Sequence, residues 1–180
     1  GAATAANRFA LAGSPGPLTL GDLDCDGFVD AVTVVGGGTL QWLRGNPASP
    51  GDFTTGGTIA LSAAVGTASG LALADLDADG DLDLVVCGSG SAVQIFSGPI
   101  PFTSQGTRTA VAATSVVLAD TDKDGDFDIV LSSSAGGAEG VYALPCTAKA
   151  TFSFGVGVRS GTTAVVRVRV ADTNRDGDLD

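Results

Sequence analysis

Carboxylates recur in this sequence in a fixed nine-residue pattern, Asp-x-(Asp/Asn)-x-Asp-Gly-x-x-Asp. The pattern occurs four times without gaps, beginning at Asp22, Asp75, Asp120 and Asp172, with spacings of 53, 45 and 52 residues. A tight loop of this kind directs the oxygens at positions 1, 3 and 5 towards one centre. Glycine at position 6 permits a sharp turn that a Cβ would hinder. Calcium takes six to eight such oxygen ligands at ~2.3–2.6 Å, so the pattern predicts calcium-binding loops.

The predicted ligands are the side chains at positions 1, 3, 5 and 9 and the backbone carbonyl at position 7. Loop by loop they are Asp22, Asp24, Asp26, Phe28 and Asp30; Asp75, Asp77, Asp79, Asp81 and Asp83; Asp120, Asp122, Asp124, Asp126 and Asp128; Asp172, Asn174, Asp176, Asp178 and Asp180. Asn174 supplies a neutral oxygen, so the fourth site is expected to be the weaker one. The apolar residue at position 8 is expected to anchor each loop to the core; these residues are Val29, Leu82, Phe127 and Leu179.

The alternative interpretation is that Asp and Gly simply mark turns. The distribution of charge argues against it, because 15 of the 20 acidic residues occupy ligand positions and three more stand at position 7. Only Asp52 and Glu139 lie elsewhere. Carboxylates packed this densely would repel one another without a cation. The all-oxygen ligand set favours Ca²⁺ over zinc or copper, and Mg²⁺ is less suited because it demands stricter octahedral geometry. About four calcium sites are therefore predicted.

Composition excludes several classes of function. The chain has 180 residues and a net charge of −11, which disfavours binding to nucleic acid or anionic lipid. No apolar run approaches the ~18 residues of a membrane span, so no membrane insertion is expected. The absence of His and the single Glu argue against an enzyme. Three cysteines allow one disulfide and a free thiol, or no disulfide; they are Cys25, Cys87 and Cys146.

Apolar residues around each motif predict β-strands. Apolar positions two and four residues before each motif are typical of a strand with one buried face; they are Leu18 and Leu20, Leu71 and Leu73, Val116 and Leu118, Val168 and Val170. Continuous apolar runs after the first three motifs, at 31–35, 84–87 and 129–131, suit strands buried on both faces. Third strands are expected at 40–43, 93–96 and 141–144, and weaker fourth strands at 58–61, 109–112 and 152–156.

Each repeat thus has the size and strand number of one blade of a β-propeller, and the predicted fold is all-β, with tandem four-stranded antiparallel blades. Residues 1–180 are expected to form a single repeat domain. Its predicted parts are 1–16 (last strand of a preceding blade, from 7–12), 17–69 (repeat 1), 70–114 (repeat 2), 115–165 (repeat 3) and 166–180 (start of repeat 4). The expectation is either a longer chain or several chains sharing one system of sheets.

The repeat resembles the FG-GAP/VCBS-type repeats of integrin α-subunit propellers and of many secreted microbial proteins. The stretch GLALADLDADGDLDLVV at 70–86 carries the resemblance most clearly. The resemblance implies that the loops join the first two strands of each blade and hold calcium on one face of a propeller, which in this family usually has about seven blades.

Three functions are compatible with these features. The first is an extracellular adhesion or structural module of a surface, matrix or filament, since loops of this type require millimolar calcium. Its partner would be a protein, a glycan or further copies of the chain. The second is a lectin, although Trp42 is expected to pack in the core. The third, least favoured, is a polysaccharide-active enzyme.

Arg167 and Arg169 alternate with Val168 and Val170, which indicates a solvated strand face in preference to a site for an acidic partner.

Overall fold

The structure is a computed structural model that describes residues 9–171. It contains three four-stranded antiparallel sheets, which confirms the all-β prediction and the four-stranded repeat. Sheet 1 has the order β1 (Pro15–Gly21), β2 (Asp30–Val35), β3 (Thr39–Gly45), β4 (Phe53–Ala60). Sheet 2 has the order β5 (Ala68–Ala74), β6 (Asp83–Gly88), β7 (Ala92–Ser97), β8 (Thr103–Thr109). Sheet 3 has the order β9 (Ser115–Ala119), β10 (Asp128–Ser133), β11 (Gly140–Leu144), β14 (Val158–Ser160).

Smaller elements join these sheets. A 3-10 turn, η1 (Ala63–Val65), leads from sheet 1 to sheet 2. A two-stranded hairpin of β12 (Cys146–Ala148) and β13 (Ser153–Phe154), with the 3-10 turn η2 (Lys149–Thr151) between them, interrupts sheet 3 before β14. Within the described part of the chain these two turns are the helical segments, and neither is long enough to cross a membrane.

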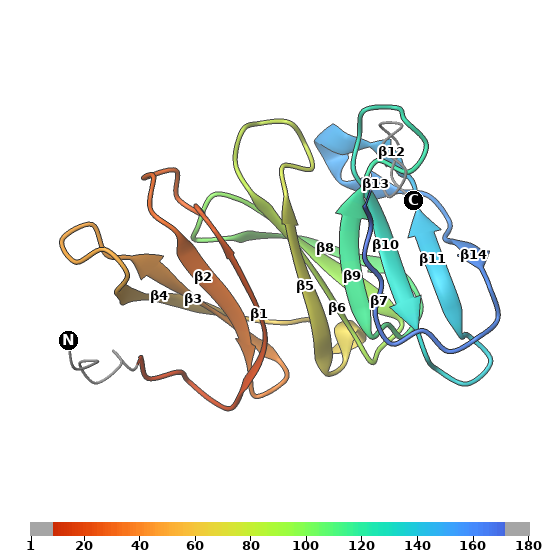
Figure 1. Ribbon diagram of the computed structural model, residues 1–180, viewed down its shortest axis with the longest axis horizontal. Helices are drawn as coiled ribbons and strands as arrows, with labels where there is room; N and C mark the ends of the chain where they lie inside the picture. Colours follow the sequence, from red (N-terminus) through yellow and green to blue (C-terminus); the bar gives the residue numbers. More distant parts are fainter. Residues whose placement is uncertain (1–8, 172–180) are drawn as a thin grey trace.

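The three sheets stack face to face in chain order (Figure 1). The second strand of each sheet is buried along its whole length, as its apolar run predicts. Side chains alternate across a strand, so sheet 2 contributes one face to each of two cores. Leu84, Val86 and Phe96 pack towards sheet 1, whereas Val85 and Ile95 pack towards sheet 3. Sheets 1 and 3 each keep one face that no other sheet of residues 9–171 covers.

The first strands stand together along one side of the stack, because β5 lies beside β1 and also beside β9. The face of β1 that points away from sheet 2 is open. Leu18 is 57% and Leu20 is 55% exposed, so the prediction that this pair would be buried is wrong. The equivalent residues of β5, Leu71 and Leu73, are partly buried against the core shared with sheet 1.

Several predicted strands are displaced. The fourth strands lie at 53–60, 103–109 and 158–160, so they overlap the predicted ranges 58–61 and 109–112 only at residues 58–60 and 109, and the predicted range 152–156 contains β13 of the hairpin instead. These edge strands are largely exposed and rich in Gly, Ser and Thr, so apolar alternation is a poor guide to them. The expected strand at 7–12 is not formed over its described part, residues 9–12. Residues 166–171 form no assigned strand either, although this segment runs beside β9.

Trp42 and the cysteines show how the cores close. Trp42 is buried against Phe102, with ring centroids 6.1 Å apart at 84°, which fits packing and not a sugar platform. A Cβ on Gly57 would lie 2.4 Å from the indole Cζ2, so β4 passes over this ring only because it has glycine there. All three cysteines are free thiols, with Cys25 exposed and the other two buried, so of the two predicted arrangements the one without a disulfide is formed.

Candidate metal centre

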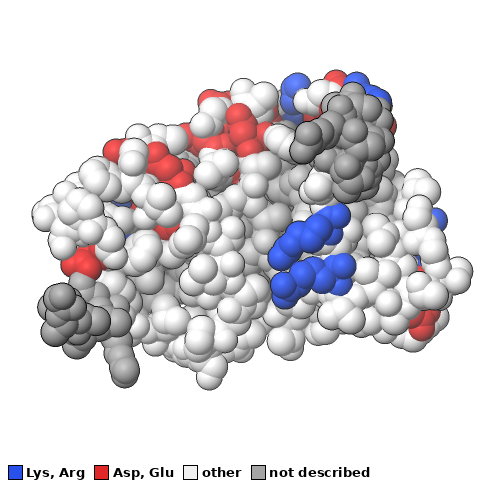
Figure 2. Space-filling view, in the orientation of Figure 1, with Lys and Arg blue, Asp and Glu red and all other residues white. Residues whose placement is uncertain are grey.

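The described Asp loops connect the first and second strands of the three sheets, and their acidic side chains gather along one edge of the molecule (Figure 2). Each loop turns twice through the left-handed region. The glycine at position 6 has φ of 85°, 99° and 88° in the three loops, as its type predicts. Position 4 is also left-handed, with φ of 59° at Cys25, 63° at Ala78 and 66° at Lys123. Nothing in the residue types at position 4 signals this second turn.

The carboxylate at position 1 organises the turn from inside. In the second loop Asp75 accepts hydrogen bonds from the backbone N–H groups of Asp79 at 3.1 Å and Gly80 at 3.0 Å. Asp22 and Asp120 accept the equivalent pairs in the other two loops. A short polar side chain that bonds to the backbone a few residues ahead is the usual way to hold such a turn.

The carboxylate at position 9 ties each loop to its own sheet. Asp83 is fully buried, and it accepts hydrogen bonds from Leu76 N at 2.7 Å and Gly98 N at 3.0 Å. Leu76 is at position 2 of the loop and Gly98 directly follows the third strand. Asp30 makes the same two bonds, to Leu23 N at 2.8 Å and Gly45 N at 2.7 Å.

In the third sheet Asp128 accepts from Thr121 N at 2.9 Å and Cys146 N at 2.8 Å, and the Thr121 hydroxyl adds a further bond to it. Position 9 is thus a structural link in all three described loops, a role that the motif spacing does not reveal.

The predicted anchor at position 8 is wrong for the first and third loops and holds for the second, whereas Leu179 of the fourth lies outside the described residues. Position 8 was expected to reach the core, but Val29 is 56% and Phe127 is 40% exposed, and only Leu82 packs against a core cluster. Position 2 takes this role in the first two loops, where Leu23 and Leu76 are buried. The N–H of position 2 bonds to position 9 in all three loops, but Thr121 in the third loop is exposed, so burial at position 2 follows its apolar side chain in the first two loops.

Carboxylates at positions 1, 3 and 9 converge in each described loop. One oxygen from each lies within 4.8 Å of the other two, in groups Asp22–Asp24–Asp30, Asp75–Asp77–Asp83 and Asp120–Asp122–Asp128. Two oxygens on opposite sides of one calcium ion would be about twice 2.3–2.6 Å apart. These separations therefore fit oxygens that share a single ion, and the three groups could hold a metal ion.

One oxygen in the first group lacks any hydrogen-bond partner. Oδ1 of Asp24 is buried and unbonded, whereas its Oδ2 meets Nε of Arg44 at 3.2 Å. A buried acceptor without a partner is costly, and a bound cation would satisfy it. The donor set and this orphaned oxygen both fit a hard divalent cation.

The pKa values of the position 3 carboxylates also favour a bound cation. Burial, reinforced by the neighbouring carboxylates Asp30 and Asp26, raises the pKa of Asp24. The pKa values of Asp77 and Asp122 are raised for the same two reasons, desolvation first and repulsion second. Burial raises the pKa of Asp83 to about 6, even though its backbone hydrogen bonds oppose the shift. Without a cation these sites resist ionisation.

The predicted ligands at position 5 stand apart from these groups. Oδ1 of Asp26, Asp79 and Asp124 accepts the backbone N–H of position 7 at 2.8, 2.9 and 2.9 Å, respectively. None of the three belongs to the converging carboxylates. The side chain at position 5 therefore closes the turn over the glycine at position 6.

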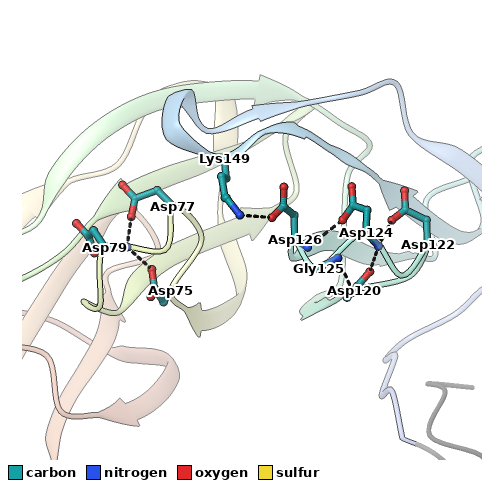
Figure 3. A network of polar contacts seen from close by, with 9 residues as sticks. All are labelled: Asp75, Asp77, Asp79, Asp120, Asp122, Asp124, Gly125, Asp126 and Lys149. Carbon is teal, nitrogen blue, oxygen red and sulfur yellow. Dashed lines mark hydrogen bonds and ion pairs between the residues drawn. The ribbon is translucent and has the colours of Figure 1, made fainter.

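The side chains at position 7 bond outside their own loops, whereas their backbone carbonyls were the predicted ligands. Oδ1 of Asp81 accepts from Sγ of Cys25, in the first loop, at 3.0 Å. Oδ1 of Asp126 accepts from Nζ of Lys149 at 2.7 Å, and Figure 3 shows Lys149 between the second and third loops in that view. Phe28, at position 7 of the first loop, is half-buried. The fourth predicted site, Asp172, Asn174, Asp176, Asp178 and Asp180, lies outside the described residues.

Comparison with known proteins agrees with the architecture. Residues 22–86 match the family described as FG-GAP-like repeat, a segment that runs from the first Asp loop through β2, β3 and β4 of sheet 1, β5 and the second loop into β6. The predicted resemblance is confirmed over that segment, which is a little more than a third of the chain. It indicates a β-propeller-like repeat module. No curated protein matches the chain.

Proposed function

We propose that this chain is a calcium-stabilised repeat module of β-propeller type that acts outside the cell as an adhesion or structural element. The observation that carries the proposal is the threefold recurrence of the carboxylate group at positions 1, 3 and 9, at the same place in three successive sheets. A chance cluster of surface acids would not recur with the same backbone hydrogen bonds each time.

Calcium would be held by the converging carboxylates, with loop carbonyls and water completing its shell. The ion would supply charge neutralisation and cross-link the two strands on either side of the loop. The protein would do the rest through its own groups: position 1 shapes the turn, position 9 fixes it to the sheet, and position 3 of the first loop presents a buried oxygen that has no hydrogen-bond partner. Binding energy of this kind becomes folding energy, because the site exists only in the folded chain.

The propeller-type arrangement is supported by the way the sheets stack. Sheet 2 packs one face against sheet 1 and the other against sheet 3. The outer faces of sheets 1 and 3, which no other sheet of residues 9–171 covers, suit further blades, from the same chain or from another copy. The loops would then form one edge of a larger assembly, which is a geometry suited to contacts with a surface or matrix.

The proposal excludes catalysis as the primary role. The sequence has no His, and 15 of its 20 acidic residues stand at loop ligand positions. The two acids outside the motifs are engaged in local bonds: Asp52 accepts from the Ser49 hydroxyl at 2.7 Å, and Glu139 accepts from Gly137 N at 3.0 Å. A general acid–base pair would have to come from groups that hold the loops together.

Thermal unfolding of the chain in EDTA, in calcium and in magnesium tests the proposal. Each site saturated at ~100 times its dissociation constant adds about 2.7 kcal/mol. A domain of this size gains roughly 2–4 °C for each kcal/mol. Several sites together should therefore raise the midpoint by ~10 °C or more in calcium, with a much smaller rise in magnesium. An unchanged midpoint in calcium would refute calcium stabilisation.

A further inference from the structure

A polar hollow opens on the side of the molecule where the first strands of the sheets stand together. Its volume is about 280 Å³. Residues from four separate parts of the chain line it: Leu18 of β1, Ser69 of β5, Thr114 and Ser115 at the start of β9, and Arg167 and Arg169 of the segment after β14. The hollow is thus built by the repeat stack as a whole and lies apart from the Asp loops.

The two arginines are held at this hollow by the backbone of their own segment. Val165 N donates to Ser133 O at 3.1 Å, Thr114 Oγ1 donates to Val165 O at 2.9 Å, and Val168 N donates to Ser115 Oγ at 3.0 Å. Val168 is half-buried, whereas both arginines are exposed. The segment therefore presents two guanidinium groups on one side, next to the hollow.

These charges are free within the part of the chain that the structure describes. Arg44, Lys149 and Arg159 each pair with a carboxylate. Neither Arg167 nor Arg169 has an acidic side chain of residues 9–171 within ion-pair distance. Where the segment after β14 crosses the molecule, Figure 2 shows a compact basic patch in the middle of the face, separate from the acidic edge.

We propose that this hollow binds an oligosaccharide that carries carboxylate or sulfate groups, with Arg167 and Arg169 as its anion-binding residues. Guanidinium is planar, always charged and able to bond an oxyanion through two N–H groups. In a chain with a net charge of −11, two neighbouring unpaired arginines are a specific attraction for an anion and not part of a general basic surface.

The size of the hollow favours a glycan over a protein partner. Small-molecule sites occupy roughly 300–1,000 Å³, and 280 Å³ lies just below that range, enough for a small acidic unit such as a sugar ring. A stable protein interface would instead need a broad complementary surface of roughly 800 Å² on each partner. The proposal is independent of the calcium sites, because none of the converging carboxylates lines the hollow.

Binding should be measured by calorimetry on the full chain at a fixed, saturating free calcium concentration. The probes are an oligogalacturonate, a heparin-derived oligosaccharide, a neutral maltooligosaccharide and a short poly-glutamate peptide. Binding to the first identifies a carboxylate ligand and binding to the second a sulfate ligand. The neutral sugar is expected not to bind.

Arg167→Gln/Arg169→Gln should weaken binding of the acidic glycan about tenfold or more, with an unchanged unfolding midpoint. Arg159→Gln is the matched control, since it removes one exposed cation elsewhere, and it should change affinity less than about twofold. Arg167→Lys/Arg169→Lys should give an intermediate loss, because it keeps charge but not the planar fork.

The proposal is overturned if neither acidic glycan binds, if the double glutamine variant binds as well as the wild type, or if Arg159→Gln weakens binding equally. It is also overturned if poly-glutamate binds more tightly than both glycans. These results would leave the calcium proposal untouched, since every measurement is made on the calcium-loaded, folded chain.

Discussion

The backbone N–H of Gly98 donates a hydrogen bond of 3.0 Å to Oδ1 of Asp83, across the 15 residues that separate the end of the second Asp loop from the end of β7. The same relationship joins Gly45 to Asp30 and Cys146 to Asp128. The last residue of the motif therefore belongs as much to the sheet as to the metal site. One loop thus holds two kinds of Asp: Asp83 links the loop to the sheet, whereas Asp77 takes part in the carboxylate group without such a link.

Asp83→Asn should destabilise the chain with or without calcium. The amide replaces one acceptor by a donor that faces the N–H of Leu76 or Gly98, and a buried pair left unsatisfied costs about 1–3 kcal/mol. Asp77→Asn, the matched control at position 3, removes a carboxylate whose ionisation is already disfavoured. It should lower stability in calcium only. Urea unfolding of both variants in calcium and in EDTA tests this, and equal losses in EDTA would contradict the distinction.

The calcium-free and calcium-loaded chains should respond to pH in opposite directions. In the calcium-free chain the pKa of Asp83 is about 6, above its ordinary value near 4, so the folded state binds more protons than the unfolded state between these values. Stability in EDTA should therefore fall as pH rises from about 4 to about 6. In calcium the ion competes with protons for the same carboxylates, so stability should fall as pH decreases through that window. Unfolding midpoints measured from pH 4 to pH 7.5 would show parallel curves if the loops bind no ion.

Ala78→Gly should stabilise the second loop. Ala78 has φ of 63°, where an L side chain costs about 1–2 kcal/mol, and glycine would recover part of this after its larger unfolded-state entropy is counted. A net gain of roughly 0.5–1 kcal/mol is expected in urea unfolding. Ala60→Gly, at an exposed position of β4, is the control and should be destabilising. A loss at both positions would mean that position 4 is unstrained.

Gly57→Ala should disrupt the core between sheets 1 and 2. Its Cβ would lie 2.4 Å from Trp42 Cζ2, so the indole or β4 must move, and overpacking of this kind costs typically 1–3 kcal/mol. Trp42 is the single tryptophan, so its fluorescence reports directly on this core. Gly38→Ala is the control because its Cβ would meet nothing within 4 Å. An unchanged emission spectrum in the Gly57 variant would contradict the predicted packing.

The sequence predicts the second strand of each sheet well, because a continuous apolar run directly follows each of the first three Asp motifs there. The runs at 31–35 and 84–87 lie within β2 and β6, which are buried on both faces. The fourth strands were misplaced because they lie at the edges of the sheets. Most of their side chains are exposed to solvent, so Gly, Ser and Thr occupy them without the apolar alternation that marks a strand. The exposure of Leu18 and Leu20 depends on which face meets a neighbouring sheet, and strand periodicity carries no information on this.

In the candidate site, too, the sequence predicts the local features but not the contacts between distant parts of the chain. The grouping of positions 1 and 3 follows from the loop itself, because both lie within a few residues of the turn. The second bond of Asp30, to Gly45 N, depends on a strand 15 residues away, and no local pattern reveals it. The hollow beside Arg167 is even less accessible to sequence, since its lining comes from β1, β5, β9 and the segment after β14.

A direct count of bound metal is the best test of whether the Asp loops hold calcium. The chain should be dialysed against buffer with 1 mM calcium and 1 mM magnesium, and bound metal should be measured by mass spectrometry. We expect about one calcium for each of the four motifs and almost no magnesium. A triple variant, Asp24→Asn/Asp77→Asn/Asp122→Asn, should lose most of the calcium bound by the three described loops. Less than one calcium bound by the wild-type chain, or equal amounts of the two metals, would contradict selective calcium binding by the Asp loops.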